Sequence, residues 1–230
     1  MDIAWFFRER TRFIRFTYER AAKPFIEMKQ QMEGGFPPFD DPPNSEDPEP
    51  HFMAEWSDAE TAIVVLGRSC VSMLSASLKL YFDTWEKELG VQWENSGKAK
   101  AWRKGFADGY LSELCDALSI DLNDCPADLA VIEQVFLARN RDQHPESIHS
   151  IKVTHSSSDR AKHPNPFFIS ESERAMYVEG ELDDITFMSP SVHVDAEMLH
   201  RAIAEAESLV DWLEPRFFAV KYPKSAAPKA

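Results

Sequence analysis

Three residues in the second half of the chain combine side chains that could act on a phosphodiester. Arg139, Asn140 and His144 lie within six consecutive positions. Side chains four residues apart meet on one face of a helix, so Asn140 and His144 would lie together with Arg139 beside them. The planar arginine guanidinium binds phosphate oxygens, and histidine exchanges a proton near neutral pH. Together they suffice for attack of a ribose 2′-hydroxyl on its own phosphodiester, which needs charge stabilisation and proton transfer but no metal.

A helix from Ala127 to about Gln143 must position these residues. Pro126 suits the first helical position, Asp128 suits the first turn, and Pro145 ends the helix. Its apolar stripe is formed by Leu129, Ile132, Val135 and Phe136. The same face continues with Arg139, Asn140, Gln143 and His144. The core-facing side is therefore expected to turn polar in its last turn and a half. Buried arginine or asparagine is costly unless paired, which favours a polar network, a subunit interface or a catalytic site.

The other segments predict an all-α chain of four or five helices. Further helices are expected over residues 2–33, 57–89, 98–118 and 196–214. Ser57 and Glu60 form a capping box that would start the second helix, and Pro215 would end the last one. The polar interval 145–194 is expected to be a loop insertion with a short β-ribbon. Its strand-like pieces are Phe167–Ser170, Ala175–Val178 and Ile185–Met188. The order of elements predicts a helical bundle and not an alternating β/α fold.

The motif Arg139-Asn140-x-x-x-His144, at the end of a helix in an all-helical chain, resembles the R-x(4–6)-H motif of HEPN domains. The resemblance covers residues 56–214 with the insertion 145–194. Segment 1–33 would be an N-terminal amphipathic helix, segment 34–55 an acidic proline-rich linker, and segment 215–230 a flexible tail. HEPN domains are four- or five-helix bundles, so the resemblance implies the same bundle here.

The resemblance also implies an activity. Many HEPN proteins are metal-independent endoribonucleases in toxin–antitoxin, phage-defence or RNA-processing systems, and two protomers bring their motifs into one composite cleft. By this resemblance, Arg139 would stabilise the scissile phosphate, Asn140 would orient the phosphate or the histidine, and His144 would be the acid/base. The products would be a 2′,3′-cyclic phosphate and a 5′-hydroxyl. The expected partners are a second copy of the chain, an RNA substrate, and an antitoxin or nucleotidyltransferase protein, with no metal or cofactor.

The role of Arg141 is open between two alternatives. Arg141 faces a different direction from Arg139 and would be a surface residue or a second, substrate-binding phosphate contact.

Two other interpretations of the protein's function remain open. The Arg–Asn–His cluster could instead stabilise the dimer interface of a noncatalytic helical interaction module. A small-ligand or nucleotide-binding bundle is a third interpretation, and it would have a closed apolar pocket away from the motif.

The charge of the chain limits how it could meet nucleic acid. The 230 residues include 39 Asp+Glu and 25 Lys+Arg, a net charge of −14, which argues against a general nucleic-acid coat. Eight acidic residues lie between Asp40 and Glu60, and no Lys or Arg occurs from Gly34 through Gly67. Part of the negative charge is thus local to the proline-rich segment, whereas the first helix is locally basic. A small phosphate-binding cleft is compatible with this distribution.

Localisation and metal sites follow from what the sequence lacks. It contains no secretory signal pattern, no uncharged stretch of the length a membrane helix needs, and neither G-x-x-x-x-G-K-[ST] nor G-x-G-x-x-G. The odd, widely spaced cysteines fit neither disulfides nor a thiolate zinc site; they are Cys70, Cys115 and Cys125. The histidines after the motif match no common zinc spacing and are expected in loops; they are His149, His155 and His163. A cytoplasmic protein without membrane attachment is expected.

Overall fold

The computed structural model describes residues 2–41, 50–144, 152–178 and 189–223. Its helices are α1 (Ile3–Gly34), α2 (Met53–Leu89), α3 (Gly97–Lys104), the π-helical segment η1 (Phe106–Leu111), α4 (Ser112–Ala117), α5 (Leu129–Gln143), α6 (Ser157–Lys162), α7 (Glu171–Val178) and α8 (Ala196–Lys221). Over these ranges the extended pairing amounts to one isolated antiparallel bridge, between Thr154 and Ser191. The all-α prediction is confirmed.

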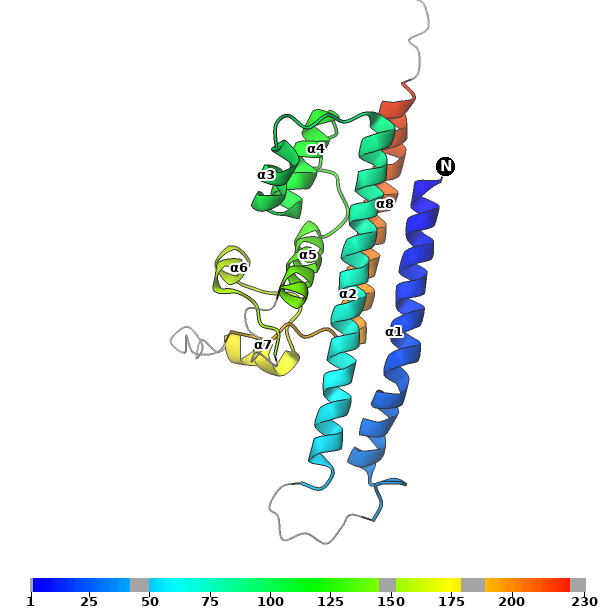
Figure 1. Cartoon of the computed structure of the whole chain (residues 1–230), viewed down its shortest axis with the longest axis vertical. Coiled ribbons are helices and arrows are strands. Elements are labelled where there is room, and N and C mark those ends of the chain that lie inside the picture. Colours follow the sequence, from blue (N-terminus) through cyan, green and yellow to red (C-terminus); the bar gives the residue numbers. More distant parts are fainter. Residues whose placement is uncertain (1, 42–49, 145–151, 179–188, 224–230) are drawn as a thin grey trace, which may run out of the picture.

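Three long helices form the body of the molecule. Helices α1, α2 and α8 run side by side along its longest axis, and the shorter helices lie on the side of α2 away from α1 (Figure 1). Helix α5 packs against both α2 and α8. Gly35 ends α1 in the left-handed conformation at φ 61°, where glycine carries no Cβ penalty.

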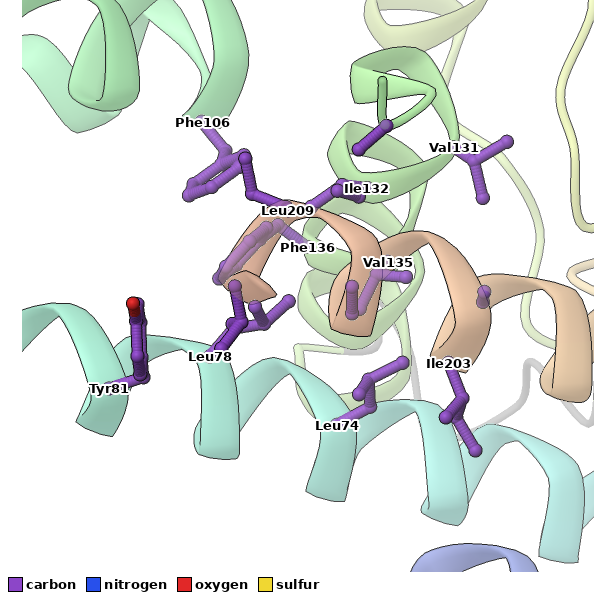
Figure 2. Packing of buried hydrophobic residues seen from close by; sticks show 14 of the residues in the cluster. Leu74, Leu78, Tyr81, Phe106, Val131, Ile132, Val135, Phe136, Ile203 and Leu209 are labelled. Atoms are coloured by element: carbon purple, nitrogen blue, oxygen red, sulfur yellow. The ribbon is translucent and has the colours of Figure 1, made fainter. Parts of the chain in front are cut away.

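The core is built where α2, α5 and α8 meet. Figure 2 shows Leu74 and Leu78 of α2 facing the apolar stripe of α5, with side chains of α8 beside them. The fully buried members of this contact include Leu74, Leu78, Phe106, Ile132, Val135, Ile203 and Leu209. Burial of one such side chain contributes roughly 1.5–3 kcal/mol, so this contact fixes α5 in place.

A half-buried carboxylate connects the long helices at one end. Glu214 of α8 accepts hydrogen bonds from the Tyr81 hydroxyl at 2.8 Å, the Trp85 indole at 2.9 Å and the Ala4 amide at 3.3 Å. Burial, and secondarily the charge of Glu214, raises the pKa of Tyr81 well above its ordinary value. These contacts join α1, α2 and α8 through one residue.

Two expected helix ends are wrong. Helix α2 begins at Met53, so Ser57 lies inside the helix and is not its cap. The added first turn is held by Trp56, whose indole donates to Glu33 at 2.9 Å. Helix α8 continues through Pro215 to Lys221, so residues 215–221 are helical and not part of a tail. Phe217 is buried against Trp85, with ring centroids 5.3 Å apart, and this packing outweighs the amide hydrogen bond that proline lacks.

The expected β-ribbon and the expected helix over 98–118 also differ from the structure. Ala175–Val178 belongs to α7, Phe167–Ser170 is loop, and Ile185–Met188 lies outside the described residues. The 98–118 segment is divided into α3, η1 and α4 because Gly105 adopts φ 122°, a conformation that favours glycine.

Candidate functional site

Helix α5 carries the motif and begins two residues later than predicted. Asp128 is its N-cap and accepts from the amides of Ala130 and Val131 at 3.1 and 3.3 Å. Pro126 therefore precedes the helix and does not occupy its first turn. The helix ends at Gln143, so Arg139 and Asn140 lie near its C-terminal end and His144 is its C-cap.

Two carboxylates that the sequence does not single out fix α5 on its neighbours. Glu133 is buried and accepts from the amides of Phe106 and Ala107 at 2.6 and 2.8 Å, at the start of η1. A Cβ on Gly105 would lie 2.8 Å from the Glu133 carboxylate, so glycine is required there. One turn after Arg139, Asp142 pairs with Arg68 Nε of α2 at 3.1 Å. These contacts determine where the motif side chains lie.

Arg139 and Asn140 lie together at the wall of an open cleft. Arg139 is half-buried and donates from Nη1 to Asn140 Oδ1 at 3.0 Å, and Asn140 is exposed. Gln143 lines the same cleft. The expectation that this end of the stripe faces the core is wrong: the last turn of α5 is polar because it lies at the surface.

His144 and Arg141 occupy other places. His144 is exposed at the C-cap of α5, donates its amide to the Asn140 carbonyl at 3.1 Å, and is absent from the cleft wall. Arg141 is half-buried and donates from Nε to the Thr154 carbonyl at 2.9 Å, which holds the segment before α6. Within one protomer, two of the four predicted site residues therefore share the cleft.

The cleft has a volume of about 730 Å³ and is enriched in positive charge. Six lysine and arginine side chains line it: Arg10, Lys79, Arg103, Lys104, Arg139 and Lys162. They come from α1, α2, α3, α5 and α6, which are distant in sequence. Each would be a solvated surface charge in isolation, so no sequence signal links them, and sequence reasoning misses five of the six.

The carboxylates of the cleft are fewer, and two are already engaged. Asp83 pairs with Lys98 at 2.6 Å, and Glu133 accepts the two amides of η1; Asp159 is the third. Lys104 pairs with Glu113 at 2.7 Å. Over the ranges that the structure describes, four more of the lining cations form no ion pair, namely Arg10, Lys79, Arg103 and Lys162. The cleft is thus a positive region in a chain of net charge −14.

One histidine of the post-motif segment lines the cleft. His163 is half-buried at the C-cap of α6, where its amide donates to the Asp159 carbonyl at 2.8 Å. His155 is buried, and its Nε2 lies 2.8 Å from the Phe168 carbonyl oxygen. Burial lowers the pKa of His155 and so disfavours its protonated form. Both lie outside regular helices, as predicted, and His149 is outside the described residues.

No family model, curated protein or solved structure matches this chain. Burial raises the pKa of Cys70 to about 11 and that of Cys115 to about 12, so neither is a thiolate at neutral pH. In the described segments, no group of three or more histidine, cysteine or carboxylate side chains could hold a metal ion.

Helix α2 has the length and apolar composition that a membrane-spanning helix would need, alone among the described helices. A core helix of a globular protein meets the same criterion, and α2 packs against α1, α5 and α8.

Proposed function

We propose that the chain is a HEPN-type endoribonuclease whose cleft binds the phosphates of RNA. The observation that carries this proposal is the group of lysines and arginines around Arg139, most of which have no carboxylate partner among the described residues. Cations left unpaired around one concave surface attract a polyanion, and charge focused in a cleft raises its local concentration. Arg139 supplies the planar donor fork that fits a phosphate.

The proposed reaction is a transfer within the RNA backbone. The ribose 2′-oxygen bonds to the adjacent phosphorus, the bond from phosphorus to the 5′-oxygen breaks, and a proton passes from the 2′-hydroxyl to the leaving oxygen through acid/base groups. Arg139 neutralises the charge that develops on the phosphoryl oxygens, and Asn140 holds the Arg139 side chain through their hydrogen bond. No step uses a metal.

His144 enters this proposal through a second copy of the chain. It is exposed at the end of α5 and outside its own cleft wall. In the proposed homodimer, His144 of one protomer reaches the Arg139 cleft of its partner and acts as the acid/base. A toxin or phage-defence role, with an antitoxin or nucleotidyltransferase protein as partner, fits this activity.

The test is cleavage of a labelled single-stranded RNA by the purified protein in EDTA. The wild type is expected to cleave and leave 2′,3′-cyclic phosphate ends. Loss of an acid/base group typically costs about 10²–10⁴-fold, and loss of a group that stabilises charge in the transition state costs about 10²–10³-fold. Cleavage by His144→Ala and by Arg139→Ala should therefore each fall at least about 100-fold. Lys100→Gln is the matched control, because Lys100 is exposed on α3 outside the cleft. Equal cleavage by wild type and both variants would contradict the assignment.

A noncatalytic dimerisation module is the second candidate, and the position of His144 outside the cleft wall favours it. It predicts no cleavage by the wild type. It also predicts that Arg139→Ala shifts the mass measured by light scattering from dimer to monomer, whereas the endoribonuclease proposal predicts a loss of RNA affinity.

A further inference from the structure

An apolar groove between α1 and α2 continues the cleft. It consists of two adjoining hollows of about 240 and 400 Å³, both lined by Phe6, Arg10 and Ser77. Arg10 also lines the cleft, and Leu80 lines both the smaller hollow and the cleft. A single concave surface therefore runs from the cations around Arg139 to the face of α1 that borders α2.

The groove presents two exposed aromatic rings. Phe6 is 51% exposed and Phe13 is 55% exposed. They lie seven residues apart on α1, which is about two helical turns and places them on the same face. Arg10 lies between them. Isolated exposed apolar residues are common, but these two line a hollow next to a positive cleft. The acidic residue of the groove, Glu9, is paired with Arg12 at 2.7 Å.

We propose that Phe6 and Phe13 are stacking platforms for the bases of single-stranded RNA whose phosphates follow Arg10 into the cleft. The inference rests on the proposed function and specifies its substrate class. Aromatic side chains beside a positive groove bind single strands with little sequence preference, because every base has a π-face. Bases inside a duplex cannot reach the rings, so the groove selects single strands. Continuity with the positive cleft favours RNA over a second protein chain as the occupant.

The test measures binding of two fluorescent probes by anisotropy. One is a 12-nucleotide 2′-O-methyl oligouridylate, which lacks the attacking hydroxyl, and the other is an abasic 2′-O-methyl backbone of equal length. Base stacking on an aromatic residue corresponds to roughly a 5- to 140-fold change in affinity. Phe6→Ala and Phe13→Ala should each weaken oligouridylate binding by that factor and leave abasic binding unchanged. Phe36→Ala is the matched control, since Phe36 is 61% exposed just after the end of α1 and lines neither the groove nor the cleft.

The remaining outcomes separate this inference from the proposed function. Arg139→Ala should weaken binding of both probes. If it does so while both groove variants bind oligouridylate like the wild type, base stacking is overturned and the phosphate cleft stands. If the groove variants instead change the mass measured by light scattering without changing RNA affinity, the groove is a protein interface and the inference fails. If Arg139→Ala binds both probes normally, the proposed function fails and the inference fails with it.

Discussion

The salt dependence of RNA binding should report how many cations of the cleft contact phosphates. Five lining cations have no carboxylate partner in the described segments, namely Arg10, Lys79, Arg103, Arg139 and Lys162. Each phosphate contact contributes about −0.7 to the slope of log K against log salt for a single strand. Five contacts therefore predict a slope of about −3.5 for the wild type.

Removing two of these charges tests the count. The double variant Lys79→Gln/Arg103→Gln should have a slope of about −2.1, because two contacts are lost. Both side chains are exposed, so the fold should not change. The measurement is anisotropy of the 2′-O-methyl oligouridylate across a range of salt concentrations, with Lys100→Gln as control at the wild-type slope. A wild-type slope shallower than about −1, or a double variant with an unchanged slope, would show that these side chains do not contact phosphates.

Three further predictions concern what holds the site in place. Glu133→Ala leaves two amides of η1 without their acceptor, so the free energy of unfolding should fall by about 3 kcal/mol and the thermal midpoint by roughly 6–12 °C. The control Glu113→Ala removes only an ion pair with the exposed Lys104 and should change the midpoint little. Asp142→Ala leaves the largely buried Arg68 unpaired and should lower the free energy of unfolding measured in urea by about 2 kcal/mol. Replacing both Asp142 and Arg68 by apolar residues should restore part of that free energy. Burial lowers the pKa of His155 in the folded state, so as the pH falls the unfolded chain binds a proton at this residue before the folded chain does. The contribution of His155 to the free energy of unfolding should be complete above about pH 6.5 and should decline below it. The urea midpoint should therefore depend less on pH in His155→Gln than in the wild type between about pH 7.5 and 5.5.

Local patterns predict much of the helical content, because each stripe must face a core. The apolar stripe of α5 is buried against α2 and α8 as expected, with Ile132 and Val135 fully covered. The helix ends are less predictable. Pro215 predicts a helix end in the sequence, but burial of Phe217 stabilises the part of α8 that follows this proline. Such an outcome depends on the residues of another helix and cannot be found in a local window.

The candidate site, like the helices, is predictable from the sequence only in part. Arg139 and Asn140 share a cleft, but the four-residue spacing predicts that Asn140 and His144 lie together, and His144 does not line that cleft. The separation of His144 from that cleft depends on where the helix ends, which spacing does not determine. The cations Lys79, Arg103 and Lys162 come from three other helices, so only the fold brings them together.

The most direct test of the central claim is a crystal structure of the protein with the 2′-O-methyl oligouridylate. The proposal predicts a phosphate within hydrogen-bonding distance of the Arg139 guanidinium, with the backbone lying along the cleft between α2, α3 and α5. An oligonucleotide bound elsewhere on the protein, with Arg139 making no phosphate contact, would contradict it.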